Sequence, residues 1–247
     1  ITHCVFTSNV ASEFAGGALG VDFTSSPSLN NNTFLTNSAP FGGAIFASGS
    51  KGLLFSNSKF LGNLATTTSA TGGGVLALQG DANNTTFVNC VFSGNKANNY
   101  SGVLKGEGST RFVNCSLTGN SANYGGITIL FSGESVAFEN SILWGNSATS
   151  SGADVFVNSQ TATASYSLFN PTQSSGSLTG SNNLSSDPLF TDADGADNTY
   201  GSADDDLTLQ SSSPAINQAS TSVTDYPSTD LLGKTRYGSA PDLGAYE

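Results

Sequence analysis

The sequence of 247 residues contains no methionine, one tryptophan, one histidine and few charged residues. Charged residues make up 10% of the chain, whereas glycine alone contributes 29 residues. A chain so rich in glycine and small polar residues suits turns and pleated strands far better than helices, which excludes long amphipathic helices as its main element. The composition therefore favours an all-β fold.

Long apolar runs are also missing. No segment approaches the roughly 18 apolar residues that a membrane-spanning helix needs. The first residues, from Ile1, show neither a basic region nor a cleavage signal. The sequence therefore predicts no membrane span.

Basic residues are few, and they are outnumbered most strongly near the C-terminus. Residues 1–180 hold seven acidic and five basic residues, whereas residues 181–247 hold eleven acidic and two basic residues. Binding to phosphate backbones or anionic lipids requires clustered lysine and arginine side chains. We therefore expect no nucleic acid partner, while cations and neutral glycans stay open as ligands.

A repeated phrase runs through most of the chain. The pattern [Phe/Leu]-x-x-Asn-x-Ala occurs six times at intervals of roughly 25 to 32 residues, and a Gly-Gly or Ser-Gly pair follows each copy. Segments such as "TTFVNCVF" alternate apolar and polar residues, which predicts strands with one buried face. The asparagines of the six copies are Asn9, Asn37, Asn63, Asn95, Asn120 and Asn146.

Two or three short strands in each unit fit one coil of a parallel β-helix better than a four-stranded propeller blade. We predict a right-handed parallel β-helix of about 7–9 coils over residues 1–186, followed by an acidic C-terminal cap over residues 187–247. Equivalent residues of stacked coils lie about 4.8 Å apart. The repeated Phe and Leu side chains, from Phe6 to Leu143, should then form a buried column.

The six asparagines are predicted to form a hydrogen-bonded ladder, because each side-chain amide can donate to the asparagine stacked on it. We also expect them to adopt the left-handed backbone conformation at a corner of each coil. A second asparagine column is predicted to point outward. For either column the alternative is a row of amides that binds carbohydrate. The second column is Asn57, Asn89, Asn114 and Asn140.

The phrases "FTSN…GGAL" and "FLTN…GGAI" resemble the repeats of the chlamydial polymorphic outer membrane proteins and their bacterial relatives, over about residues 1–170. Those proteins are surface-exposed right-handed β-helix adhesins. The ending "DLGAYE" is similar to the last coils of secreted bacterial β-helix proteins that carry a surface-anchoring or sorting segment. The resemblance implies a secreted bacterial protein at the cell surface, with a glycan or a host-cell receptor as its partner.

The stretch "TDADGADNTYGSADDDL" contains six aspartates and no basic residue. Clustered carboxylates repel one another unless a cation lies among them, and Ca²⁺ takes about six to eight oxygen ligands from flexible loops. We therefore predict a calcium site, with a solvated loop as the alternative. The predicted ligands are Asp192, Asp194, Asp197, Asp204 and Asp206.

Polysaccharide-cleaving β-helix enzymes use either a basic residue near calcium-binding carboxylates or paired aspartates. The sequence shows neither arrangement, and its nearest charged group, Asp81, Lys105, Glu107 and Arg111, is interpreted as a solvated edge. We therefore predict a non-catalytic structural or adhesive protein. The alternatives are a polysaccharide lyase or hydrolase and a filament or sheath subunit that associates end to end through an uncapped first coil.

Two smaller predictions concern cysteines and the tail. Cys90 and Cys115 occupy equivalent positions in neighbouring coils, where parallel Cβ directions oppose a disulfide, so we expect buried free thiols. Cys4 lies too far along the chain to join either of them. In the tail, Arg236 and Asp242 are predicted to pair and to hold the tail against the last coils.

Overall fold

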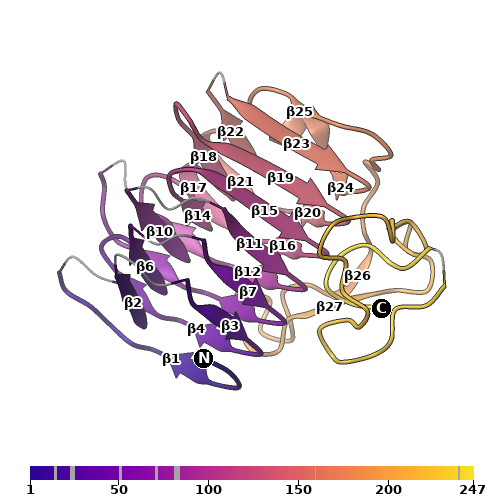
Figure 1. Cartoon of the computed structure of the whole chain (residues 1–247), viewed down its shortest axis with the longest axis horizontal. Coiled ribbons are helices and arrows are strands. Elements are labelled where there is room, and N and C mark those ends of the chain that lie inside the picture. The colour runs from indigo at the N-terminus through magenta and orange to yellow at the C-terminus, as the bar shows by residue number, and fades with distance from the viewer. Residues whose placement is uncertain are drawn as a thin grey trace.

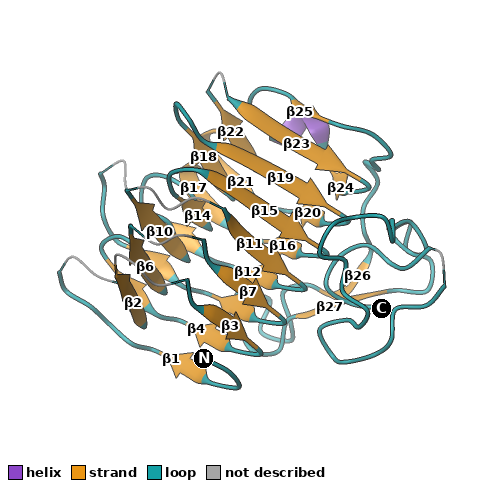
Figure 2. Cartoon of the chain, in the orientation of Figure 1, coloured by secondary structure: helices purple, strands orange, loops and turns teal. Residues whose placement is uncertain are grey.

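The computed structural model describes residues 1–247 except 14–15, 23–25, 50–51, 70–71, 81–83, 159 and 239. The described residues form a parallel β-solenoid whose coils stack from the N-terminus upward (Figure 1), with strands joined by short loops (Figure 2). Seven strands stack in the largest sheets, which gives about six turns. The predicted all-β solenoid is confirmed, with slightly fewer coils than the 7–9 expected.

Four parallel sheets run along the solenoid, numbered here in the order in which one coil meets them. The first sheet contains β1 (Val5–Thr7), β4 (Thr33–Leu35), β8 (Lys59–Leu61), β12 (Val91–Ser93), β16 (Ser116–Thr118), β20 (Ile142–Trp144) and β24 (Leu168–Phe169). The second contains β5 (Ser38–Ala39), β9 (Leu64–Ala65), β13 (Lys96–Ala97), β17 (Ser121–Tyr124) and β21 (Ser147–Ser151).

The third sheet follows the Gly-Gly or Ser-Gly pairs. It contains β2 (Leu19–Asp22), β6 (Ile45–Ser48), β10 (Leu76–Gln79), β14 (Leu104–Lys105), β18 (Thr128–Leu130) and β22 (Val155–Val157). The fourth sheet returns the chain to the first. It contains β3 (Ser28–Asn30), β7 (Leu54–Ser56), β11 (Thr85–Val88), β15 (Ser109–Val113), β19 (Ser135–Glu139), β23 (Thr161–Ser165) and β25 (Leu178–Thr179).

The remaining elements follow the sixth coil. They are a short 3-10 helix, η1 (Pro171–Gln173), and an antiparallel pair, β26 (Phe190–Asp192) and β27 (Asp206–Leu209). Within the described ranges, no helix has the length and apolar character needed to cross a bilayer.

Two columns of stacked phenylalanine rings fill the interior. In the first sheet, neighbouring ring centroids from Phe6 to Phe92 lie 4.8 to 5.1 Å apart. In the fourth sheet, neighbouring centroids from Phe55 to Phe138 lie 4.7 to 5.1 Å apart. The columns meet edge to face, a geometry that aromatic pairs prefer. The first column was predicted from the repeat, whereas the second was not.

The asparagine ladder is confirmed. The side-chain amide of each ladder residue from Asn37 to Asn120 donates to the side-chain oxygen of the asparagine one coil further, at 2.9 to 3.0 Å. The same amide donates to a main-chain carbonyl of the preceding coil. From Asn37 to Asn146 these residues are at most 6% exposed. Burial excludes the carbohydrate-binding alternative for these ladder residues.

The predicted left-handed conformation is wrong for the ladder, because it lies one residue earlier. The residue before each ladder asparagine has φ between 52° and 68°. This residue bends the chain from the first sheet toward the second, so the asparagine that follows can point inward with an ordinary backbone conformation. The left-handed residues are Ser8, Thr36, Gly62, Gly94, Gly119 and Gly145.

The second asparagine column holds a left-handed corner of its own, with φ of 48° to 52° from Asn57 to Asn140. Its predicted outward direction is confirmed for Asn89 and Asn140, which bond to residues outside the coils, although Asn89, Asn114 and Asn140 are covered and at most 1% exposed. Residues near the C-terminus cover them: Asn89 donates to the main-chain oxygen of Thr229, and Asn140 to that of Ser220. The amides of Asn89 and Asn140 therefore bind the protein itself, which excludes the carbohydrate alternative for these two residues.

The residues from 187 to 247, called here the C-terminal layer, lie along the side of the solenoid rather than over its end (Figure 1). Leu207, Leu243 and Tyr246 pack with Val91 and Ile142 of the first sheet in one buried cluster. Apolar side chains on the outer face of a sheet need such a cover. The acidic segment expected as a cap is therefore a lateral layer.

Arg236 anchors this layer, but not through the predicted pairing with the Asp242 carboxylate. Its Nη2 donates to Oδ1 of Asn89 at 2.9 Å and to the main-chain oxygen of Gly244 at 2.8 Å. Its Nη1 donates to the main-chain oxygen of Asp242, and its ion pair is with Glu247 at 3.5 Å. Since Asn89 lies between β11 and β12, the anchor is at a middle coil and not at the last coils.

The cysteine prediction is confirmed. Cys90 and Cys115 are buried and free, and Cys4 is free and half-buried. Burial raises the pKa of the Cys115 thiol well above its ordinary value, which keeps the thiol protonated and unreactive.

Candidate functional site

The asparagine ladder ends at Asn146, at the last turn of the second sheet. In the next coil Phe169 stacks on Leu143, but the chain then turns away through η1 instead of adding a strand to β21. Asn170 starts this turn by accepting a hydrogen bond from the main-chain nitrogen of Thr172 at 3.1 Å. No strand of the next coil therefore lies beside Asn146, whereas each earlier strand of the second sheet is followed by another one.

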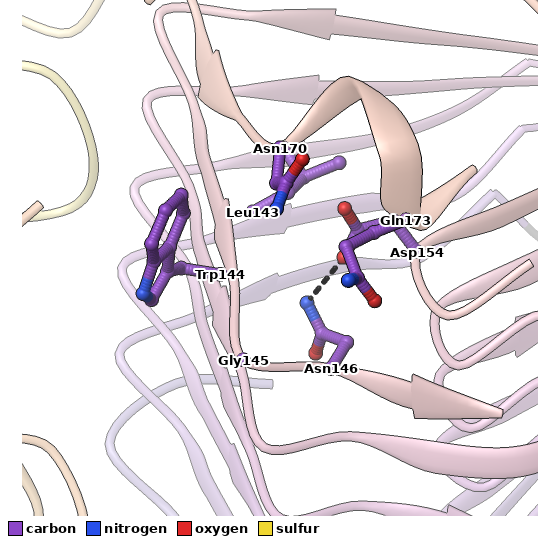
Figure 3. Close-up of a pocket in the computed structure, with 7 residues that line it drawn as sticks. All are labelled: Leu143, Trp144, Gly145, Asn146, Asp154, Asn170 and Gln173. Carbon is purple, nitrogen blue, oxygen red and sulfur yellow. Dashed lines mark hydrogen bonds between the residues drawn. The ribbon is translucent and has the colours of Figure 1, made fainter. Parts of the chain in front are cut away.

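Asp154 takes the place of the missing asparagine. The Nδ2 atom of Asn146 donates to Oδ1 of Asp154 at 2.9 Å (Figure 3). Main-chain hydrogen bonds hold Asp154 in place. Its main-chain nitrogen donates to the main-chain oxygen of Gln173 at 2.9 Å, and its main-chain oxygen accepts from the main-chain nitrogen of Ile127 at 2.8 Å. The ladder therefore ends on a fixed carboxylate.

The carboxylate of Asp154 is buried and only half satisfied. The residue is 1% exposed, and its Oδ2 atom has no hydrogen-bond partner among the described residues. Burial raises its pKa from 3.8 to about 6, although the hydrogen bond from Asn146 acts in the opposite direction. Asp154 thus changes its charge close to neutral pH.

A pocket of about 260 Å³ adjoins this carboxylate and is called here the end pocket. Its rim includes Gly145 and Gln173, which are exposed, and Asp154 lies at its buried side. Figure 3 shows Asn146, Asp154, Asn170 and Gln173 around a common space. The lining residues are Leu143, Trp144, Gly145, Asn146, Asp154, Asn170 and Gln173.

The lining limits the chemistry of the end pocket. Asp154 is the one titratable residue among the seven that line it. Glycoside hydrolysis uses two carboxyl groups on opposite sides of the scissile bond. The arrangement suits recognition of a small polar ligand by one carboxylate and several amides.

Asp154 was not predicted as a site residue, although the sequence contains a signal for it. Its main chain lies in register with Ala44, Val75, Val103 and Ile127, which follow the glycine pairs of the earlier coils and are fully buried. A single aspartate in a column that is otherwise apolar marks a special position. The end of the repeat after Asn146 marks the same place.

The predicted calcium ligands lie in and around the turn that joins β26 to β27. Asp192 and Asp206 are opposite one another in this antiparallel pair. Asp197 accepts from the nitrogen of Thr199 at 2.8 Å, and Asp204 from that of Ala196 at 2.9 Å. The main-chain oxygen of Asp194 also accepts from Thr199. In the part of the chain that the structure describes, no three acidic, histidine or cysteine residues are grouped so that they could hold a metal ion. Calcium binding stays a prediction.

Asp205, which was not among the predicted ligands, fixes this loop to the solenoid. Its Oδ2 accepts from the nitrogen of Gly201 at 2.8 Å and from the hydroxyl of Ser93 in β12. The acidic loop is therefore attached to the outer side of the first sheet.

The charged group interpreted as a solvated edge is more closely paired than expected. Lys105 is 6% exposed and forms an ion pair of 2.8 Å with Glu134, so the interpretation is wrong for this residue. Arg111 pairs with Glu139 at 2.6 Å and with Asp225 of the C-terminal layer at 2.7 Å. Glu107 is exposed, and Asp81 lies outside the described residues.

Comparison with known proteins agrees with this geometry. The family described as "Right handed beta helix region" matches residues 1–143. A search of curated proteins finds no match. Since the matched region covers more than half of the 247 residues, the chain belongs to the right-handed β-helix family.

Proposed function

We propose that this right-handed β-helix is a non-catalytic extracellular protein with a structural or adhesive role at a bacterial cell surface. The observation that carries the proposal is that the repeated side chains contact one another inside the coils. The ladder asparagines bond to one another and the phenylalanine rings stack on one another inside the coils. The inward side chains of the repeat therefore build the interior of the solenoid, which leaves the outer faces and the end pocket for ligand binding.

The charged side chains support the same proposal. Lys105 and Arg111 are held in ion pairs with Glu134 and Glu139, which connect neighbouring coils. The end pocket offers a single carboxylate with amides around it. Such a site is suited to binding, whereas polysaccharide hydrolysis requires a second carboxyl group.

The repeat phrases that resemble those of the chlamydial surface adhesins support the location and the adhesive role. A rod of stacked coils presents long lateral faces, a shape that repeat proteins use for extended binding surfaces. The ligand of such a face would be a glycan or a receptor on a host cell.

Binding and cleavage can be measured on the same material. We expect the purified chain to bind immobilised glycans or cultured cells and to release no soluble sugar from acidic or neutral polysaccharides. Heat-unfolded protein is the control for nonspecific attachment. Sugar release that depends on the folded chain would replace this proposal with the enzyme alternative. End-to-end association stays a prediction, which electron microscopy of the purified protein tests.

A further inference from the structure

The end pocket contains a buried acceptor that the protein itself leaves unused. Oδ1 of Asp154 receives a hydrogen bond from Asn146, whereas Oδ2 has no partner among the described residues. A buried carboxylate without a counter-charge is costly, and the cost falls when a cation pairs with it. The second oxygen is therefore a place where a positively charged group would be stabilised.

Two amides lie beside this carboxylate. Asn170 uses its Oδ1 to accept from Thr172, and its Nδ2 makes no hydrogen bond within the described residues. Gln173 is exposed, and its side chain likewise makes no hydrogen bond within the described residues. Both amides line the end pocket together with Asp154 (Figure 3). They can donate to and accept from hydroxyl groups of a ligand.

The size and walls of the pocket favour an organic cation over a bare metal ion. Its volume of about 260 Å³ lies just below the roughly 300 Å³ at which sites for drug-sized molecules begin, so it suits a smaller ligand. Ca²⁺ takes about six to eight oxygen ligands, and the pocket supplies one carboxylate. The amides of Asn170 and Gln173 add hydrogen-bonding groups that suit an organic ligand with hydroxyl groups.

We propose that the end pocket binds an amino sugar through its primary ammonium group. The ammonium group donates to Oδ2 of Asp154, and the ring hydroxyls meet the amides of Asn170 and Gln173. The net charge of −11 favours the approach of a cationic ligand. This inference rests on the adhesive function proposed above and names a ligand chemistry for it.

Figure 3 shows the indole ring of Trp144 on the opposite side of its strand from Asp154, so binding is followed by calorimetry and not by tryptophan fluorescence. The wild-type protein is titrated with glucosamine, and with glucose as the neutral analogue of nearly the same shape. We expect saturable binding of glucosamine and binding of glucose that is weaker by about tenfold or more. N-acetylglucosamine, which lacks the charge, should behave like glucose.

Variants identify the groups responsible, with binding measured by calorimetry. Asp154→Asn removes the charge and keeps an oxygen for Asn146, so glucosamine should lose its advantage over glucose. Gln173→Ala should weaken glucosamine binding, and the exposed position of Gln173 preserves the fold. Asp22→Asn removes one charge at an exposed position of β2 and is the matched control, which should bind like the wild type.

The proposal is overturned if glucosamine and glucose bind equally, if neither binds, or if a folded Asp154→Asn protein keeps its preference for glucosamine. Thermal melts establish whether this variant is folded. If it is not, wild-type affinity in Gln173→Ala together with equal binding of the two sugars overturns the proposal. Attachment of the whole chain to glycan surfaces that is unaffected by Asp154→Asn would leave the adhesive function standing and reject the end pocket as its site.

Discussion

Asn146 donates a hydrogen bond of 2.9 Å to Asp154, at the point where each preceding ladder asparagine meets the next asparagine. The ladder is a chain of neutral amides up to this residue and ends on a group that can carry a negative charge. Burial disfavours that charge. The stability of the last turn of the solenoid therefore depends on pH.

We expect Asp154→Asn to stabilise the protein at alkaline pH and to leave it nearly unchanged at pH 4. The folded state holds the pKa of Asp154 at about 6, above its ordinary value of 3.8, so the folded state binds the proton more tightly. The contribution of Asp154 to stability is fully present below pH 4 and is lost as pH rises to about 6. The full loss is about 3 kcal/mol, which the asparagine avoids.

Urea unfolding of both proteins between pH 4 and pH 8 measures this difference. The free energies of unfolding should diverge between pH 4 and pH 6 and run parallel above that range. Asp22→Asn, at an exposed position of β2, is the comparison for removal of any one charge. Curves that stay parallel over the whole range would show that Asp154 titrates normally.

A second prediction concerns the middle of the ladder. Asn95→Ala removes two donated hydrogen bonds, to Phe60 and Asn120, and leaves the buried amide of Asn63 without its acceptor. We expect a loss of about 3 kcal/mol in the free energy of unfolding, because unsatisfied buried polar groups are costly. Asn9→Ala, in the exposed first coil, should cost less than about 1 kcal/mol. Equal losses in the two variants would mean that the ladder adds nothing beyond local structure.

Much of the solenoid could be predicted from the sequence, because stacking turns a linear repeat into direct contacts. The spacing of Phe60, Asn63 and Ala65 recurs in the next coil, and the coils pair in that register. The ladder and the first phenylalanine column follow from this register alone. The backbone conformation at the corner was harder to predict, because Gly62 and Asn63 can both adopt a left-handed conformation. The structure shows that Gly62 adopts it.

The C-terminal layer and the end pocket could not be predicted in this way. Arg236 contacts Asn89 across 147 residues, and no periodicity relates these two positions. Asn89 faces outward as predicted, but no repeat indicates that the C-terminal layer covers it. Asp154 became recognisable only when the register placed it in line with buried Val103 and Ile127. Contacts outside the repeat depend on tertiary packing, which single-sequence patterns do not encode.

A third prediction uses two glycines with similar backbones and different surroundings. Gly119 and Gly133 have φ of 63° and 86°, so alanine is strained at both. A Cβ atom on Gly119 would overlap the ring of Tyr200, whereas one on Gly133 would meet no atom within 4 Å. Gly119→Ala should therefore cost about 2 kcal/mol more than Gly133→Ala. Thermal unfolding measures both, and equal costs would show that Tyr200 does not rest on the glycine corner.

A fourth prediction concerns the anchor of the C-terminal layer. Arg236→Met removes the hydrogen bonds to Asn89 and Gly244 and leaves Glu247 without its ion pair. We expect the C-terminal layer to become sensitive to proteolysis while the solenoid stays protected, since the phenylalanine columns do not involve Arg236. Lys234→Met, at an exposed position two residues away, is the matched control and should stay resistant. Resistance of both variants would assign the attachment to the apolar cluster alone.

The last prediction tests calcium in the acidic loop. If Asp192, Asp194, Asp197, Asp204 and Asp206 bind Ca²⁺, then EDTA should lower the melting temperature and added calcium should restore it. The loop must first rearrange, because Asp197 and Asp204 now accept hydrogen bonds from their own loop. Free calcium at about 100 times its Kd would stabilise the folded state by about 3 kcal/mol. Asp194→Asn should reduce the response, whereas Asp154→Asn, outside the loop, should keep it. A melting transition that EDTA leaves unmoved rejects the site and retains the solvated loop, whose aspartates are then held by main-chain and hydroxyl donors alone.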